Sequence, residues 1–299
     1  MRPIPIFDTN LFGHAQSGKI SPSEWRFLLR HRPGRGWPLS AVTALELLVD
    51  LDNATEETFL NFRERIDFAL RVSNGRILEE PRLLICRDVL HVPFPAHIPR
   101  LPVEVLSAHM HVIRRARSLK QLREGRIPWK SGYARLEATD ALKNVVEGVK
   151  KQWIRQVEDF ADNVFPHWRT CFEKTGRRLP PEMRKNVDRK SMFEMRSMGF
   201  VEGLLSWLKA KKEPEVLSDV RKRLDSVLRF TAFVVDQFLE RNYSLEKHSS
   251  DVFDQFQLHY LALDRFTIVS EDTDMWKRTA ESPQASRIMS FETFLESLH

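Results

Sequence analysis

The chain has 299 residues, 42% of them hydrophobic and 29% charged, so it can bury a sizeable core and is not expected to be disordered. A formal net charge of +6 and a pI near 9.4 favour acidic partners, of which nucleic acid is the commonest. The two cysteines, Cys86 and Cys171, have no partner at a metal-ligand spacing and are expected to be buried free thiols.

The first residues carry no recognisable targeting signal. Residues 1–7 contain one Arg and two prolines and lead directly into an acidic motif, which leaves no room for a signal peptide. No apolar run approaches the roughly 20 residues that are needed to span a bilayer. We therefore expect a cytoplasmic, soluble protein that makes no membrane contact.

The N-terminal region is predicted to alternate a strand with helices. Ile4–Phe7 is a short apolar run that fits a buried parallel strand ending at Asp8. Ser21–Glu24 combines a cap residue, a proline and an acid, and so opens a helix through about residue 30. After a loop rich in Gly and Pro, Ser40 caps a second helix, which carries Glu46 nearly two turns into a mostly apolar run.

The middle of the chain, from about residue 54 to residue 247, has an overwhelmingly helical pattern. Apolar residues recur in steps of three and four over 136–172, which predicts one long amphipathic helix that Pro166 ends or kinks. A second stripe runs over 216–238, so a helical bundle is expected. Residues 92–102 hold four prolines in eleven positions and are predicted to form an extended connection.

The strand signal returns near the C-terminus. Phe266–Ser270 is β-branched and apolar, and residues 287–290 are a weaker candidate. An amphipathic stretch, Asp251–Leu263, leads directly into the first of these strands and is predicted to be a helix that packs on the sheet. The two ends of the chain are therefore expected to be α/β, and the middle is expected to be α.

Carboxylates stand beside apolar runs at four positions: Asp8, Glu46, Asp254 and Asp272. Ligands collect outside the carboxyl ends of parallel strands, so Asp8 and Asp272 should face one crevice, with the helix of Asp254 beside them. Ionised carboxylates this close together repel one another unless cations neutralise them or some of them take up protons. Oxygen-preferring Mg²⁺ or Mn²⁺ suits these groups and would support phosphodiester chemistry. Asp251, on the same helical face as Asp254, could replace or support it.

The same residues resemble the motifs of the PIN-domain ribonucleases. The resemblance lies in Asp8-Thr9-Asn10, in the helix with Thr43 and Glu46, and in the segment from Asp254 to Asp272. The separation of the last two acids, 272 − 254 = 18, matches the spacing typical of that family. Ser270 stands where the family has Thr, which is a mild departure because both residues carry a hydroxyl.

The resemblance covers residues 1–52 and 248–299, and it implies a PIN-like parallel sheet flanked by helices. Residues 53–247 would then be a large all-α insertion. By the same resemblance, the four acids become the catalytic residues and the ligands of Mg²⁺ or Mn²⁺. The supporting or substrate-contacting candidates are Thr9, Asn10, Asp251, Ser270 and Asp274.

Two basic stretches of the middle region are candidate nucleic-acid contacts, because a phosphate backbone would be attracted to either one. A solvated helix face or salt bridges within the insertion would explain the same residues. The candidates are Arg114, Arg115, Arg117, Lys120, Arg123, Lys130, Arg177, Arg178, Arg184 and Lys185.

Together these patterns predict a metal-dependent endonuclease that acts on RNA in preference to DNA. An alternative is a non-catalytic PIN-like scaffold whose helical insertion binds nucleic acid or a protein partner such as an antitoxin. A phosphatase of the haloacid dehalogenase type also begins with an Asp after the first strand. Its usual second acid corresponds to Asn10 here, which puts that hypothesis behind the others. The sequence leaves open whether the protein forms a homo-oligomer.

Overall fold

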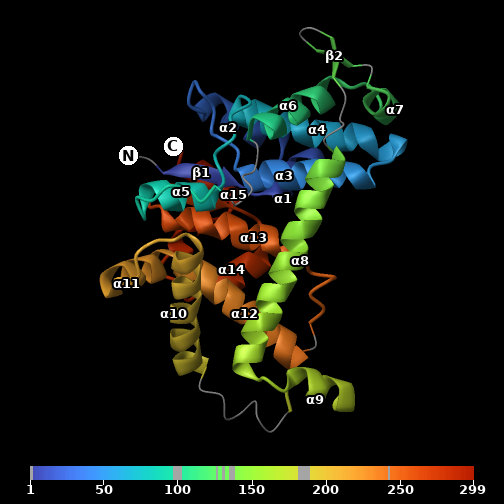
Figure 1. Cartoon of the computed structure of the whole chain (residues 1–299). Helices are drawn as coiled ribbons and strands as arrows, with labels where there is room; N and C mark the ends of the chain where they lie inside the picture. The colour runs from blue at the N-terminus through green and yellow to red at the C-terminus, as the bar shows by residue number, and fades with distance from the viewer. Residues whose placement is uncertain are drawn as a thin grey trace.

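The computed structural model describes residues 3–96, 103–125, 127–129, 132–134, 139–180, 189–241 and 243–299. In these residues, helices surround a small parallel sheet that is built from both ends of the chain (Figure 1). The expected α/β class, with a parallel sheet flanked by helices in a helix-rich chain, is therefore confirmed.

The sheet consists of three short parallel strands in the order β1-β4-β5. Strand β4 (Phe266–Val269) is fully buried between β1 (Ile4–Phe7) and β5 (Ile288–Met289). Pro5 lies on the edge strand β1, where a residue without an N–H can be tolerated. Both strand candidates near the C-terminus are thus confirmed, and β1 lies beside β4, a strand from the opposite end of the chain.

The first three helices begin where the sequence places caps. Helix α1 (Thr9–Gln16) follows β1 directly, and α2 (Pro22–His31) starts with a capping box in which Ser21 and Glu24 bond each other's backbone N–H. Helix α3 (Ala41–Val49) is capped by Ser40, whose hydroxyl accepts a hydrogen bond from the Thr43 N–H at 2.8 Å. A short 3₁₀ turn, η1 (Asp50–Asn53), follows.

The next elements in the chain are α4 (Glu56–Ser73), α5 (Pro81–Asp88), α6 (Val103–Arg115), α7 (Leu119–Arg123), β2 (Ile127–Trp129), β3 (Gly132–Ala134), α8 (Thr139–Val164) and α9 (Trp168–Thr175). They are followed by α10 (Arg189–Trp207), α11 (Pro214–Arg223), α12 (Asp225–Arg241), α13 (Asp251–Leu258), η3 (His259–Ala262), α14 (Thr273–Thr279), η4 (Ala285–Arg287) and α15 (Phe291–Glu296). Helices α13 and α14 are the two that flank β4 in the sequence.

The sequence pattern predicted an all-α middle region, and this prediction is wrong in one place. Strands β2 and β3 form an antiparallel hairpin in which Trp129 pairs with Gly132. Pro128 and Gly132 both oppose a helix, which explains why the chain leaves the helical pattern here. The prediction for 136–172 is confirmed, since α8 ends and α9 begins on either side of Pro166. None of the described helices has the length and the apolar character needed to cross a membrane.

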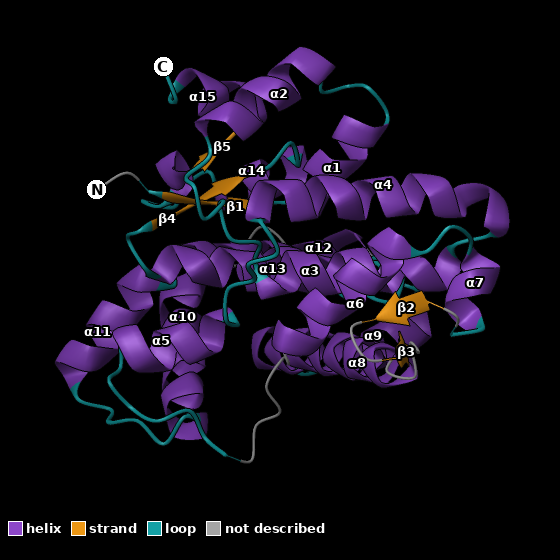
Figure 2. Ribbon diagram, turned by 90° about the horizontal axis from the view of Figure 1, so that it is seen from above, coloured by secondary structure: helices purple, strands orange, loops and turns teal. Residues whose placement is uncertain are grey.

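Several described helices of the middle region pack onto the elements around the sheet. Helix α4 contacts α1, α6 contacts α3, and α12 contacts α14. One continuous hydrophobic cluster contains residues from all of these helices, and Figure 2 shows helices on both sides of the sheet. The expected insertion and the expected core therefore share a hydrophobic core, although they are distinct in the sequence.

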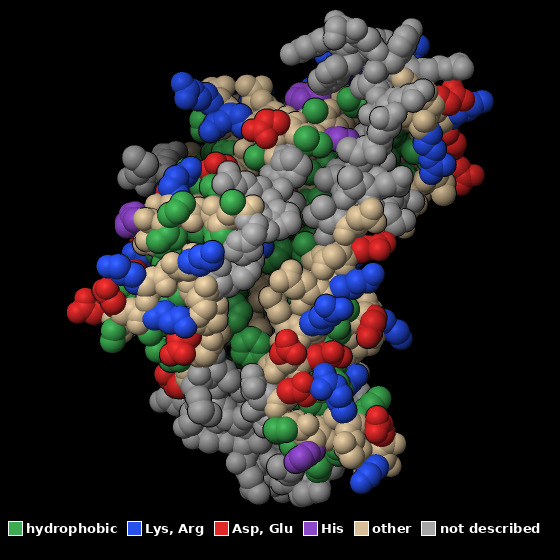
Figure 3. Space-filling model, viewed as in Figure 1, with side chains coloured by type: hydrophobic (Ala, Val, Ile, Leu, Met, Phe, Trp, Pro, Cys, Tyr) green, Lys and Arg blue, Asp and Glu red, His purple; other side chains and the backbone are tan. Residues whose placement is uncertain are grey.

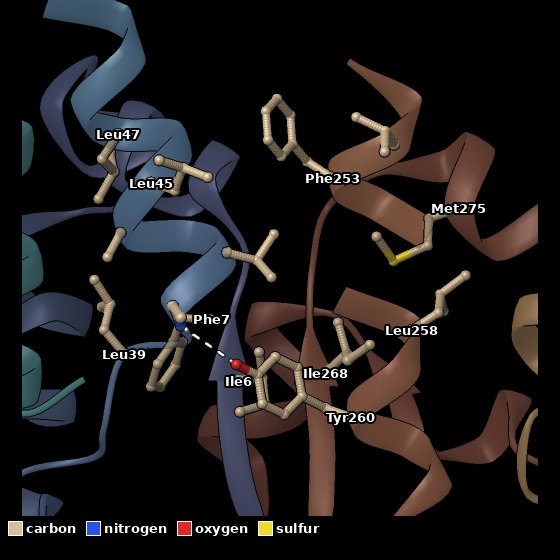
Figure 4. Close-up of a cluster of buried hydrophobic side chains, with 14 of the residues drawn as sticks. Ile6, Phe7, Leu39, Leu45, Leu47, Phe253, Leu258, Tyr260, Ile268 and Met275 are labelled. Carbon is tan, nitrogen blue, oxygen red and sulfur yellow. Dashed lines mark hydrogen bonds between the residues drawn. The ribbon is translucent and has the colours of Figure 1, made fainter. Parts of the chain in front are cut away.

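A buried tyrosine joins three parts of this core. The Tyr260 hydroxyl, in η3, accepts a hydrogen bond from the Ala41 N–H at 3.3 Å and donates one to the Glu79 carbonyl at 2.8 Å (Figure 4). This hydroxyl links the start of α3 to the segment that leads into β4. Both cysteines are free thiols. Cys86 is buried as expected, whereas Cys171 is only half-buried, which differs from the expectation.

Candidate functional site

Asp8 lies at the point where β1 ends and α1 begins. Its backbone N–H continues the sheet by donating to the Val269 carbonyl at 3.0 Å. Its carboxylate, only 4% exposed, accepts hydrogen bonds from the Thr9 N–H at 2.6 Å, Gln257 Nε2 at 3.2 Å and Ser270 Oγ at 2.5 Å. Burial raises the pKa of Asp8, and the nearby Asp272 charge adds to the rise, although the three hydrogen bonds oppose it.

Ser270 connects the carboxyl ends of β1 and β4. Its Oγ is fully buried, donates to Asp8 and accepts a hydrogen bond from the Asp272 N–H at 3.0 Å. The Asp272 carboxylate then caps α14 by accepting hydrogen bonds from the N–H groups of Asp274 at 2.7 Å and Met275 at 3.3 Å. The parallel pairing of β1 with β4 thus brings together two acids that are far apart in sequence.

Glu46 reaches the same place from α3. Its carboxylate accepts a hydrogen bond from the Thr9 hydroxyl. One turn earlier in the helix, the Thr43 hydroxyl donates to the Phe7 carbonyl at 2.9 Å, which anchors α3 to the end of β1. Burial, followed by the charge of Asp8, raises the pKa of Glu46 to about 8.

Asp254 completes the group from α13. Burial raises its pKa well above the usual range, and the charges of the other three acids raise it further. No hydrogen bond to its carboxylate is found among the residues that the structure describes. Gln257, on the next turn of α13, donates to Asp8 and so holds this helix against the end of β1. We call these four acids, from β1, α3, α13 and the end of β4, the carboxylate cluster.

Two unpartnered amide oxygens lie beside the carboxylate cluster. Asn10 uses its Nδ2 to donate to Ser270 Oγ at 3.5 Å, and Gln257 uses its Nε2 to donate to Asp8 and to Thr43. In the described part of the chain, Asn10 Oδ1 and Gln257 Oε1 are buried without a hydrogen-bond partner. A buried carbonyl oxygen without a donor is costly, so the site has more acceptors than donors.

The chemistry of these groups fits a hard divalent cation. Carboxylate and amide oxygens are the ligands that Mg²⁺ and Mn²⁺ prefer, and a cation would relieve the repulsion that raises the pKa values of the acids. As the described side chains are oriented, however, no three of the His, Cys, Asp or Glu groups are arranged to hold one ion. Glu46 is turned toward Thr9, and Asp272 is turned toward the backbone of α14.

The two acids expected to be outer members have other partners. Asp251 accepts a hydrogen bond from the Tyr243 hydroxyl and forms an ion pair with Arg278 Nη1 at 2.5 Å. This pair joins the start of α13 to α14. Asp274 is exposed and lies 3.6 Å from the Lys277 ammonium. Asp254, rather than Asp251, therefore has the free carboxylate on α13.

Two of the basic candidates, exposed Arg114 and half-buried Arg178, interact with other groups of the protein. Arg114 forms an ion pair with Asp67 at 2.6 Å. Arg178 donates to the Phe238 and Tyr243 carbonyls, and its guanidinium lies 3.9 Å from the centroid of the Phe238 ring. Burial lowers the pKa of Arg178. These two residues support the structural explanation of the basic stretches.

The other described basic candidates lie at the surface. Arg117, Lys120, Arg123 and Arg177 are exposed, as is Arg115, which borders an open pocket of about 540 Å³ on α6. Figure 3 shows basic and acidic side chains interspersed over α8, without a single basic patch on that face. Lys130, Arg184 and Lys185 lie outside the described residues.

Three residues near the carboxylate cluster were missed by the sequence analysis. Gln257 could have been found, because a polar side chain one turn after Asp254 on an apolar helix is unusual. Trp276 is 39% exposed. It lies four residues after Asp272, the N-cap of α14, and this helical spacing could have identified it as a neighbour of Asp272. Lys150, on α8, has no local signal, because only the packing of α8 brings it near the acids.

Comparison with known proteins adds no relative. No protein-family model matches the chain, and neither the curated proteins nor the solved structures include a significant match. The resemblance to the PIN-domain ribonucleases therefore rests on the motifs and their spacing. The chemistry of this chain has to be inferred from the carboxylate cluster itself.

Proposed function

We propose that this chain is a metal-dependent endonuclease with a PIN-like core, and that it hydrolyses phosphodiester bonds in RNA. The observation that carries the proposal is the convergence of four acids from separate elements around two unpartnered amide oxygens. Strongly perturbed carboxyl groups that act on one another are typical of functional sites. A purely architectural cluster would be expected to contain its own cations.

In this proposal the four acids hold one or two Mg²⁺ or Mn²⁺ ions, and the amide oxygens of Asn10 and Gln257 add neutral acceptors. The chemistry supplied by a bound ion is an activated water and compensation for charge on the phosphoryl oxygens. The hydroxyls of Thr9 and Ser270 orient Glu46 and Asp8, to which they donate hydrogen bonds. No serine or histidine nucleophile is required.

An exposed aromatic residue supports an unpaired strand as substrate. Helical side chains lean toward the N-terminus, so an indole at Trp276 covers surface on the Asp272 side of its own turn. An exposed indole can stack on an unpaired base of any sequence. Because unpaired bases are the usual targets in RNA, RNA is favoured over DNA.

The second candidate is a non-catalytic scaffold that binds nucleic acid or a protein partner. One observation favours it: no three of the described metal-ligating side chains are arranged to hold an ion. In a scaffold, the bonds of Glu46 to Thr9 and of Asp8 to Ser270 would be permanent structural contacts. In the nuclease, these hydroxyl donors are released or shared when a cation binds.

The test is cleavage of labelled single-stranded RNA and DNA by the purified chain with Mg²⁺, with Mn²⁺ and with EDTA. We expect Mg²⁺- or Mn²⁺-dependent cleavage of RNA, and a loss of at least a hundredfold in the variants Asp8→Asn and Asp254→Asn. Asp274→Asn is the matched control, because Asp274 is an exposed acid paired with Lys277. Activity that survives Asp8→Asn, or no activity on either polymer with either ion, would contradict the proposal.

A further inference from the structure

Helix α8 lies across the carboxylate cluster. It contacts α3, which carries Glu46, and α13, which carries Asp254, and Figure 1 shows its upper half beside both helices. The sequence of α8 belongs to the middle region, about as far from one end of the chain as from the other. Two of the elements that carry the four acids, α3 and α13, are therefore contacted by a helix that carries none of them.

Lys150, on α8, interacts with the surroundings of these acids. Its Nζ lies 5.7 Å from the centroid of the Phe253 ring, and Phe253 directly precedes Asp254. Phe253 is only 2% exposed, so its ring is held in place by packing and gives the Lys150 ammonium a fixed aromatic contact. The charge of Lys150 also opposes the rise in pKa that burial causes at Glu46 and at Asp50.

The Lys150 ammonium is not consumed by an ion pair. Within the described residues, no carboxylate oxygen lies within 4.0 Å of it, and no hydrogen bond from it is found. By contrast, Arg278, whose pKa is raised by the charges of Asp251 and Asp254, is bound to Asp251 at 2.5 Å. Lys150 is thus a half-buried cation beside the cluster, and among the described residues no ion pair or hydrogen bond uses its donors.

A phosphodiester carries a negative charge and would be repelled by a site made of carboxylates. A lysine is a compact point charge with three donors, which suits it to hold a phosphate oxygen. We propose that α8 supplies Lys150 as a positioning residue that binds a phosphate of the nucleic-acid strand beside the carboxylate cluster. This inference rests on the proposed function, since it assigns a substrate contact to the same site.

The experiment compares Lys150→Met with Lys151→Met, because Lys151 is the next residue on α8 and is exposed to solvent. Two readouts are measured: RNA cleavage kinetics with Mn²⁺, and binding of a labelled single-stranded oligonucleotide in EDTA over a range of salt concentrations. We expect Lys150→Met to lower kcat/KM at least tenfold, mostly through KM. The slope of log K against log salt should fall by about 0.7, the value for one phosphate contact on a single strand.

Lys150→Arg should restore most of the binding and the salt slope, which a purely structural role for Lys150 would not require. Lys150→Gln, which keeps a polar end of similar length, replaces the Met variant if that variant does not fold. If the parent cleaves RNA and Lys150→Met behaves like Lys151→Met in both readouts, the role of Lys150 is wrong and the nuclease proposal stands. If the parent neither cleaves nor binds the strand, both proposals are wrong.

Discussion

Asp251 and Asp254 lie three residues apart on α13, and they stand in opposite electrostatic environments. Asp251 is paired with Arg278 and bonded to Tyr243. Asp254 has no hydrogen bond among the described residues and is surrounded by other acids, which together with burial raise its pKa. One helix therefore carries a carboxylate in an ion pair and, one turn later, a carboxylate for which the described residues supply no ion pair.

The difference separates a structural acid from a candidate functional acid. A buried charge with its own cation holds elements in place, and here the pair joins α13 to α14. A buried acid among other acids is destabilising when ionised, and strongly perturbed acids of this kind cluster at functional sites. The carboxylate cluster is therefore expected to respond to added cations and to pH, and the Asp251 pair is not.

The largest effect is expected from Arg278→Met. The side chains of this pair are only 8% and 11% exposed, so the variant leaves the Asp251 charge buried without its cation. The free energy of unfolding should fall by about 3–5 kcal/mol, as measured by urea unfolding at pH 7. Asp254→Asn is the comparison variant and should be neutral or stabilising, because it removes repulsion. If both variants lost the same free energy of unfolding, the distinction between a structural Asp251 and a functional Asp254 would be wrong.

Addition of Mn²⁺ should stabilise the protein through the carboxylate cluster. At a concentration of 100 times Kd, a ligand that binds only the folded state adds about 2.7 kcal/mol. We expect a rise of several degrees in Tm, measured by differential scanning fluorimetry, which disappears in Asp8→Asn and persists in Asp274→Asn. A parent protein whose Tm does not respond to Mn²⁺ would favour the scaffold.

Trp276 is an exposed aromatic residue on α14, two residues before the Arg278 that forms the ion pair with Asp251. We expect Trp276→Ala to weaken binding of a single-stranded oligonucleotide about tenfold, because one stacked base contributes about 1–3 kcal/mol. Phe172→Ala is the matched control, since Phe172 on α9 is also 39% exposed. Fluorescence anisotropy measures both. Equal loss in the two variants would make Trp276 an ordinary surface residue.

The smallest expected effect, counted per pH unit, is the change in the free energy of unfolding that the titration of Glu46 causes. Its pKa is about 8 in the folded protein and near 4.5 when unperturbed, so the folded state holds an extra proton between these values. The free energy of unfolding should therefore fall as pH rises from about 4.5 to about 8, by at most about 1.4 kcal/mol per pH unit. Glu46→Gln should remove this contribution in urea unfolding with EDTA. An unchanged pH profile would show that Glu46 is not perturbed.

Features that depend on neighbouring residues were predicted well from the sequence. Ser21 and Ser40 cap helices where expected, and Pro166 separates α8 from α9. Caps and helix breaks depend on the conformation of a few adjacent residues, so they can be recognised locally. The strands at both ends were also found, because β1 and β4 are short apolar runs with clear ends.

Features that depend on distant residues were predicted less well. The basic stretches were read as candidate contacts, but Arg114 and Arg178 are bound to Asp67 and to the Phe238 and Tyr243 carbonyls. Charge in a sequence does not reveal which charges are already paired. Similarly, the shared hydrophobic core of the two predicted regions depends on helix faces that meet only in the folded chain.

By itself, the sequence determined which residues are acids at the ends of apolar elements and which elements carry them. The tertiary structure decided that Asp251, and not Asp254, has an ion pair among the described residues, and that Lys150 and Gln257 lie near the acids. The physical reason is the range of the interactions: capping and periodicity act over one turn, whereas burial and charge pairing depend on groups that only the folded chain brings together.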